Sequence, residues 1–222
     1  MTLAREHRLN ALGLLPVWRR RKAVSAADAV SAHPPAMADG WTALEAEIRA
    51  CTRCPLHATR HNAVPGGGDP QADWLIVGEA PDAEEDGQGA PFVGQAGQLL
   101  DAMLAAIGLK RGEKVYITHL LKSHPPANRD PAPDEIMACL PYLERQIALI
   151  QPRIILVLGR FAAQTLLGAD IPVDRLRGQV HTYQGVPLVV TYHPAYLLRT
   201  PVDKGRAWAD LLLARRQLKA PQ

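Results

Sequence analysis

The chain has 222 residues, of which 47% are hydrophobic and 21% are charged, and its formal net charge is +3. These values are typical of a folded globular protein and exclude a chain that is disordered throughout. No apolar run approaches the roughly 18–20 residues of a membrane-spanning helix, so the composition also argues against a membrane protein. The three cysteines are too few for a disulfide scaffold, and no signal peptide is recognisable. We therefore expect a cytoplasmic protein.

Residues 1–40 form a segment of distinct composition. They include four consecutive cations (residues 19–22) and an Ala/Ser-rich stretch, without a sustained apolar period. We predict a poorly ordered basic and alanine-rich extension. A basic arm that contacts phosphates and an organelle transit peptide are the two alternatives. The folded domain is then expected to span residues 41–222.

Helical and strand patterns alternate after residue 40. Strands are predicted for four short apolar runs, residues 74–77, 115–117, 154–158 and 188–190. Helices are predicted for residues 41–50, 99–107, 136–150, 161–167 and 203–218, with Asp134 as the N-cap of the third. Apolar strands separated by helices are typical of a parallel sheet that is covered on both faces. The predicted fold class is α/β, a three-layer αβα sandwich around a central four-stranded parallel sheet.

The loops that follow the four strands carry the polar motifs, and ligands bind at this end of a parallel sheet. The first loop reads Gly-Glu-Ala-Pro-Asp (residues 78–82) and continues through Phe92. The second contains His119 and then Lys-Ser-His-Pro-Pro (residues 122–126). The fourth reads Tyr-His-Pro-Ala (residues 192–195), followed by Leu-Leu-Arg (residues 197–199). A Cys-x-x-Cys pair, Cys51 and Cys54, precedes all of them.

In order and spacing, these motifs resemble those of the iron–sulfur-type uracil-DNA glycosylases, called family 4, over about residues 41–215. The resemblance implies a DNA-repair glycosylase that flips uracil out of DNA and hydrolyses its N-glycosidic bond. Such an enzyme acts in base excision repair and is monofunctional, without a lyase step. The resemblance also implies uracil-containing DNA as the partner, a monomer, and a nucleoid-associated location in a bacterial cytoplasm.

This reaction requires a hydrogen-bond donor at a pyrimidine oxygen, an aromatic platform for the base and a carboxylate near the sugar. His193 suits the donor role because it begins a strand-end loop, and Glu79 matches the family's carboxylate. These two are the predicted catalytic residues. The predicted uracil-binding residues are Glu79, Ala80, Pro81, Glu85, Phe92, His119 and His193, with Phe92 as the stacking ring.

Contacts with the DNA itself are predicted in two groups. Leu197 or Leu198 matches the wedge of the family's intercalation loop, and Arg199 would contact a phosphate. Cations in the other motifs are candidates for contacts with the DNA backbone: Lys122, Arg129, Arg160 and Arg177.

Three positions depart from the family pattern. His119 stands where members have asparagine, and a neutral imidazole cannot present the adjacent donor and acceptor of an amide. Asp82 replaces a glycine and Ser123 replaces a cysteine. A catalytically weak or covalent uracil-DNA-binding homologue is therefore the alternative function. A redox or metal-storage protein is a third hypothesis, for which no other motif argues.

The cysteines match three of the four ligands of the family's 4Fe–4S cluster: Cys51, Cys54 and Cys139. Such a cluster normally takes four thiolates. The fourth predicted ligand is His124, and Ser123 is the other candidate. A lost cluster and a zinc ion on three cysteines and one histidine are the alternatives. In each case the metal site is expected to be structural.

Overall fold

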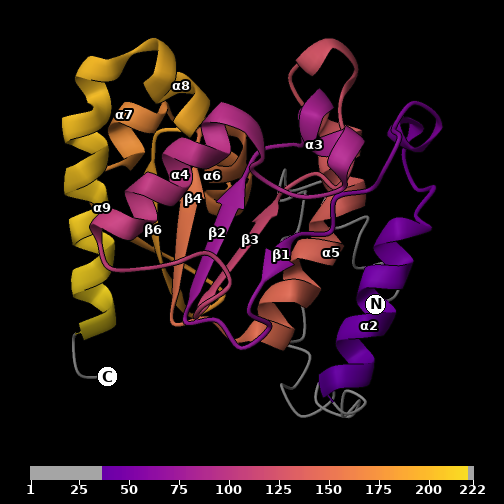
Figure 1. Ribbon diagram of the computed structural model, residues 1–222, viewed down its shortest axis with the longest axis horizontal. Helices are drawn as coiled ribbons and strands as arrows, with labels where there is room; N and C mark the ends of the chain where they lie inside the picture. Colours follow the sequence, from indigo (N-terminus) through magenta and orange to yellow (C-terminus); the bar gives the residue numbers. More distant parts are fainter. Residues whose placement is uncertain (1–36, 220–222) are drawn as a thin grey trace, which may run out of the picture. The chain divides into compact units, whose positions relative to one another are not determined.

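The computed structural model describes residues 37–219, so the hypotheses about residues 1–36 lie outside the described residues. Within them, a six-stranded sheet has the strand order β1-β3-β2-β4-β6-β5 (Figure 1). The strands are β1 (Gly67–Gly68), β2 (Trp74–Gly78), β3 (Val115–His119), β4 (Ile154–Leu158), β5 (Val180–Tyr183) and β6 (Val186–Thr191).

The helices connect these strands. The α-helices are α2 (Met37–Arg49), α3 (Ala83–Gln88), α4 (Gly94–Ala106), α5 (Pro133–Ile150), α6 (Arg160–Leu167), α7 (Val173–Leu176), α8 (Pro194–Arg199) and α9 (Lys204–Lys219). Three short 3₁₀ turns complete the set: η1 (Pro55–Ala58), η2 (Pro126–Asn128) and η3 (Pro201–Asp203). No helix in this part of the chain is both long and apolar enough to cross a membrane.

The four predicted strands form the centre of the sheet, where β3, β2, β4 and β6 are parallel neighbours. The two edge strands were not predicted, and both are antiparallel: β1 pairs with β3, and β5 pairs with β6. The αβα sandwich is thus confirmed, whereas the predicted count of four strands is too low. Two glycines carry no hydropathy pattern, which explains why β1 escapes a prediction based on side chains.

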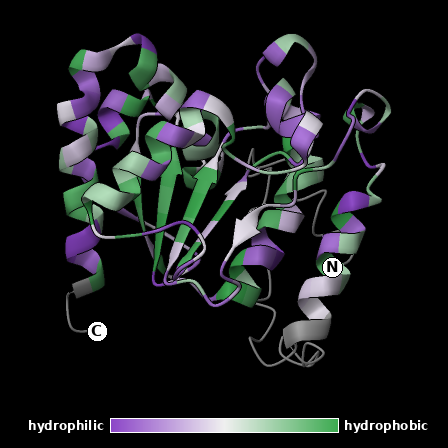
Figure 2. Ribbon diagram, in the orientation of Figure 1, coloured by the Kyte–Doolittle hydropathy of each residue, from purple (hydrophilic) through white to green (hydrophobic). Residues whose placement is uncertain are grey.

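Alternate residues of the central strands point to opposite faces of the sheet, as the two-residue period of a strand requires. On one face, Leu75 and Val157 pack in a core with helices α5, α6 and α7. On the other face, Ile76 and Leu156 pack in a second core with α4 and α9. Figure 2 accordingly shows the central strands as a hydrophobic layer. Burial on both faces explains why these strands read as continuous apolar runs.

Two helix starts differ from the prediction. Helix α2 begins at Met37, four residues before the expected start at residue 41. The N-cap of α5 is Ala132, not Asp134, so that prediction is wrong. Pro133 occupies the first helical turn, where proline is favoured because no intrahelical N–H is needed. The carboxylate of Glu135 then accepts the N–H of Ala132 at 2.9 Å and supplies the cap.

The register of the sheet brings the carboxyl ends of the central strands together. Gly78 pairs with His119, and Leu158 pairs with Thr191. The arrowhead of β2 in Figure 1 points to the end of the sheet where α3 and α8 lie. The loops that carry the sequence motifs therefore start at one edge of the molecule's core, as the parallel topology predicts.

Candidate active site

Glu79 follows β2 directly, and its carboxylate lies against the first turn of α6. Its Oε1 accepts a hydrogen bond from the backbone N–H of Phe161 at 2.8 Å. Gly159 permits this approach, because it has a φ of +99° and a Cβ there would lie 2.5 Å from Oε1 of Glu79. Burial raises the pKa of Glu79, although the N–H groups of Phe161 and Arg160 oppose that shift. A half-buried carboxylate with a raised pKa on a cleft wall is a candidate for catalysis.

His193 is the N-cap of α8, and the helix fixes the tautomer of its ring. Its Nδ1 accepts a hydrogen bond from the backbone N–H of Ala195 at 3.2 Å. A neutral ring that accepts at Nδ1 carries its proton on Nε2, so Nε2–H is the available donor. Burial, followed by the charge of His119, lowers the pKa of His193 to about 4. At neutral pH this residue is therefore an uncharged hydrogen-bond donor.

Phe92 brings the two predicted pocket histidines together. Its ring is 3% exposed and stacks on His119 at a centroid distance of 4.8 Å and an interplanar angle of 26°. It also stacks on His193 at 5.4 Å and 30°. The backbone N–H of Phe92 donates to Oε1 of Glu85 at 2.5 Å, which anchors the loop that carries the ring. Four predicted uracil-binding residues thus form one contiguous group.

His119 is buried at the end of β3, where its ring lies beside the carboxylate of Glu85. Its side chain is 1% exposed, and Nε2 lies 3.2 Å from Oε2 of Glu85. Neither ring nitrogen has an aligned hydrogen-bond partner among residues 37–219. Burial would raise the pKa of Glu85, but the adjacent His119 and the N–H groups of Asp82 and Phe92 outweigh it and lower that pKa. Among the described residues Nδ1 lacks even a contact of this kind, and a buried polar atom without a partner costs free energy, so the ring is a candidate ligand-binding position.

Asp82, the residue that replaces a family glycine, caps α3. Its Oδ1 accepts the N–H groups of Glu84 and Glu85 at 2.9 Å each. In return, Glu85 Oε2 accepts the N–H of Asp82 at 2.9 Å, which completes a capping box. The departure at Asp82 is therefore explained by helix capping.

A cleft of about 580 Å³ opens at the carboxyl ends of the strands. Both predicted catalytic residues line it, as does Ala80, whereas Pro81 is buried. Phe92 and His119 are not part of its lining and lie deeper in the protein. The remaining charged residues that line the cleft are Arg129, Asp130, Arg160, Asp174 and Arg199.

The predicted wedge segment is helix α8, and its two leucines have different environments. Leu197 is 1% exposed and packs with Tyr192 and Ala207. Leu198 is 39% exposed, so of the two it is the one that can reach DNA. Arg199 lines the cleft beside them.

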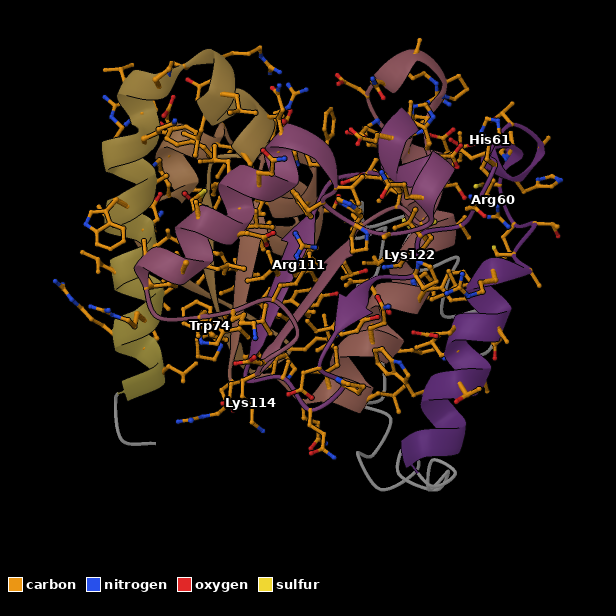
Figure 3. All side chains as sticks on the ribbon, in the orientation of Figure 1. Arg60, His61, Trp74, Arg111, Lys114 and Lys122 are labelled. Carbon is orange, nitrogen blue, oxygen red and sulfur yellow. The ribbon has the colours of Figure 1, made fainter. Side chains whose placement is uncertain are left out.

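Two of the predicted backbone contacts are contradicted by their burial and bonding. Lys122 is 1% exposed and lies in the interior of the protein (Figure 3). Arg177 is engaged by the buried carboxylate of Asp210 through two hydrogen bonds of 3.0 Å. Arg129 and Arg160, in contrast, line the cleft.

The three cysteines lie within electrostatic reach of one another. Cys54 and Cys139 pack in one apolar group. Burial raises the pKa of Cys139 to about 11, and the neighbouring Cys54 and Cys51 contribute to that shift. Two of these thiols follow α2 and the third belongs to helix α5. The group of three cysteines therefore brings those two segments together.

The candidate fourth ligands are engaged elsewhere. Ser123 Oγ accepts a hydrogen bond from Arg60 at 2.9 Å, and the same guanidinium donates to the backbone oxygens of Arg49 and Cys51, each at 2.9 Å. His124 Nε2 lies 2.7 Å from Oδ1 of Asn128, on the exposed side of the loop. Among the described residues, no group of three or more His, Cys, Asp or Glu side chains is arranged to hold a metal ion.

The residues present therefore do not fit a 4Fe–4S cluster with four protein ligands. They supply three thiols, and the side chain at the missing cysteine's position is bonded to Arg60. This role of Arg60 was not predicted, because Arg60 lies between the motifs (labelled in Figure 3). Phe161 was also missed as a cleft residue, because an apolar residue in a helix pattern is ordinarily assigned to the core.

Comparisons with known proteins place the chain in a family. The family model described as the uracil DNA glycosylase superfamily matches residues 65–212. A Type-4 uracil-DNA glycosylase of Archaeoglobus fulgidus is 47% identical over 163 residues, which cover 70% of this chain and 81% of that protein. One of Pyrobaculum aerophilum is 44% identical over 175 residues, covering 75% and 88%. A Type-5 uracil-DNA glycosylase of Thermus thermophilus is 36% identical over 173 residues, covering 68% and 75%.

Proposed function

Since the chain belongs to the uracil-DNA glycosylase superfamily, we propose that it removes uracil from DNA by hydrolysing the bond between the base and the deoxyribose. The observation that carries this proposal is the shared cleft of Glu79 and His193, with Phe92 directly behind it. This reaction requires three groups: an anionic carboxylate, an uncharged hydrogen-bond donor and an aromatic ring.

The base must first leave the helical stack, because its glycosidic bond is not accessible inside a duplex. Leu198 is exposed on α8 and is suited to fill the space that the flipped nucleotide leaves. Phe92 is the ring on which the base stacks. Because His119 and His193 now cover Phe92, binding of a base requires these rings to move apart.

His193 stabilises the departing base. Cleavage leaves negative charge on the uracil ring, and an Nε2–H donor aimed at a ring oxygen stabilises that charge more in the transition state than in the ground state. The hydrogen bond from Ala195 holds the donor in place before the base arrives. Because the pKa of His193 is about 4, its imidazole is neutral at neutral pH. It therefore polarises the uracil oxygen by hydrogen bonding and does not carry a positive charge itself.

Glu79 acts on the sugar side of the bond. As the base departs, the deoxyribose becomes cationic, and an ionised carboxylate stabilises it or orients the attacking water. The N–H groups at the start of α6 hold the carboxylate in one position. The cysteine site takes part in none of these steps, and we propose for it a structural role.

The test is to incubate the purified full chain with uracil-containing single-stranded and duplex oligonucleotides, and to measure free uracil and denaturant-resistant protein–DNA complexes together. Multiple turnovers of uracil release are expected. One covalent complex per site, without further release, would contradict the proposal and identify a binding homologue.

The matched variants are Glu79→Gln and Glu84→Gln, which remove one carboxylate each from neighbouring positions. Glu79→Gln should lower release by about 10²-fold or more, the usual size for a preorganised electrostatic group. Glu84 lies on the exposed side of α3, so its variant should retain activity. The raised pKa of Glu79 implies that release declines as the pH falls through that pKa, because protonation removes the required anion. His193 remains neutral above about pH 4, so it does not cause this decline.

A further inference from the structure

The side chains of Arg160 and Phe161, at the first turn of α6, form a pair on the cleft wall that the reaction above does not use, since only the backbone N–H groups of these residues contact Glu79. The guanidinium carbon of Arg160 lies 4.3 Å from the centroid of the Phe161 ring. Both residues line the same cleft as Glu79. Half of the Arg160 side chain is exposed. The arginine is thus held against a ring on one side while a large part of its surface faces the cleft.

Asp130 holds the same guanidinium from another direction. Nη2 of Arg160 lies 3.2 Å from Oδ2 of Asp130, on the loop that precedes α5. Cation–π contact with Phe161 and this ion pair together restrict the rotation of the planar group. A planar cation that is fixed in this way is a surface on which a nucleic-acid base can stack.

We propose that Arg160, backed by Phe161, is a stacking platform for the base of a nucleotide adjacent to the flipped uracil. This inference rests on the proposed function, and it assigns to the cleft a second subsite beside that of the uracil nucleotide. The ligand is a DNA base without a defined sequence, because every base presents a π-face.

The charges favour a base over a phosphate at this position. The positive charge of Arg160 is already partnered by Asp130, and Asp174 and Glu79 add further acidic groups to the cleft. Arg199 lines the same cleft, and within residues 37–219 it has no ion-pair partner. A phosphate is therefore better accommodated by Arg199, and the face of Arg160 is left for a base.

This platform has a consequence for the substrate. A base that stacks on Arg160 must leave its neighbours in the DNA, which costs less in a single strand than in a duplex. The subsite thus favours uracil in single-stranded DNA or next to an unpaired base.

The experiment compares Arg160→Lys, Arg160→Gln and Phe161→Leu in binding and in single-turnover uracil release. Lysine keeps the charge and loses the plane, whereas leucine keeps apolar contact and loses the ring. Each variant should weaken affinity for a single-stranded uracil oligonucleotide about tenfold, within the range for loss of one stacked base. The control is Arg153→Lys. Arg153 lies just before β4, whereas Arg160 lies just after it, so the two arginines are at opposite ends of that strand. Arg153 donates to the backbone oxygen of Leu218.

A second arm removes the partner base instead of the protein group. Oligonucleotides carry an abasic analogue on the 5′ or the 3′ side of the uracil. On one of the two sides, the wild type should lose about the same affinity as Arg160→Lys does, and the variant should lose little more. Additive losses on both sides would overturn the proposal.

Salt dependence separates stacking from a phosphate contact. Arg160→Gln should leave the slope of log affinity against log salt unchanged, because no phosphate contact is lost. A slope reduced by about 0.7, together with full activity of Arg160→Lys, would assign Arg160 to a phosphate and overturn the platform. Affinity is measured by anisotropy, independently of release. A wild type that binds but never releases uracil would contradict the proposed function while the stacking test still gives its own result.

Discussion

His119 and Lys122 are two buried polar side chains that lie three residues apart at the exit of β3, and their surroundings differ. Each is 1% exposed. Nζ of Lys122 donates to Oγ1 of Thr118 at 2.6 Å, to the backbone oxygen of His119 at 2.6 Å and to Oε1 of Gln146 at 2.8 Å. The charged ammonium has three hydrogens, so these three bonds satisfy it in full, although burial lowers the pKa of Lys122 to about 7. Among residues 37–219, neither nitrogen of the His119 ring has an aligned hydrogen-bond partner, and its one charged neighbour is the carboxylate of Glu85, 3.2 Å from Nε2.

We interpret this difference as one between a residue of the scaffold and a candidate binding residue. Burial alone does not identify a functional residue, because both side chains are buried and both belong to a motif loop. A satisfied network gives a fixed shape, and Lys122 joins β3 to helix α5 in this way. An unsatisfied group beside an aromatic ring retains its hydrogen-bonding capacity for a ligand. The following experiments test whether substitutions in the pocket change uracil release, and whether substitution of the hydrogen-bonded Lys122 changes the stability of the fold.

The largest effect is expected for His193→Ala, which should lower the catalytic rate and leave stability nearly unchanged. Loss of one preorganised donor should lower the rate of uracil release about 10²–10³-fold. The melting temperature should change little, because within the described part of the chain the ring makes a single hydrogen bond, at the start of α8. The matched control is His181→Ala, whose ring lies near the backbone oxygen of Leu176 on the edge strand β5. Equal loss of activity in both variants would show that the cleft assignment is wrong.

Lys122→Met is the corresponding test of the scaffold. The variant removes the lysine donor from three buried oxygens, of which Gln146 Oε1 retains the Thr118 hydroxyl at 3.2 Å, so we expect a loss of about 2–3 kcal/mol in the free energy of unfolding. Urea unfolding measures it, with Lys110→Met as the control because Lys110 is 75% exposed. A stability loss as small as that of the control would contradict the distinction between the two buried side chains.

His119→Asn sharpens the comparison from the pocket side. An amide offers an adjacent donor and acceptor to the uracil edge, which the imidazole does not. We expect release of uracil, or its preference over cytosine, to rise about tenfold, since a good bidentate base contact contributes about 1–3 kcal/mol. Rates on uracil- and cytosine-containing strands are measured side by side. If neither the rate of uracil release nor the preference for uracil changes, while His193→Ala is inactive, then His119 does not contact the edge of the base.

Ser123→Cys should have the smallest effect on uracil release and a distinct effect on metal content. The substitution completes the set of four thiols that a 4Fe–4S cluster takes and removes the acceptor of the Arg60 hydrogen bond. Iron per chain, measured after anaerobic purification, should be higher than in the wild type and should persist longer in air. His124→Ala serves as the control and should leave iron unchanged, because that ring faces Asn128. A wild type with about four irons per chain would show that three cysteines suffice.

The central sheet could be predicted from sequence because burial on both faces gives its strands an unbroken apolar pattern, as in Ile154–Leu158. The edge strands could not be predicted in the same way. Gly67–Gly68 has no side chains, and Val180–Tyr183 is only half buried, so its polar pattern resembles a loop. The N-cap of α5 was misplaced because the backbone preference of Pro133 outweighs the capping tendency of Asp134.

For the site, the strand-end motifs identified the cleft residues Glu79 and His193 because parallel topology places such loops together. Contacts between segments that are distant in the sequence could not be predicted. The bond from Arg60 to Ser123 spans 63 residues, and the burial of Lys122 depends on Gln146 of α5. Nothing local distinguishes a lysine that reaches DNA from one that is enclosed by the fold.

The short antiparallel strands at both edges of the sheet bear on self-association. A free strand edge presents unpaired N–H and C=O groups that can recruit another chain and start a fibril. Here β1 offers only two residues and β5 only four, while the longer apolar strands are enclosed between them. Within residues 37–219, loosening of the cleft loops therefore exposes no long hydrophobic strand edge. We expect variants that inactivate the cleft to remain monodisperse at concentrations where a variant that removes β5 aggregates.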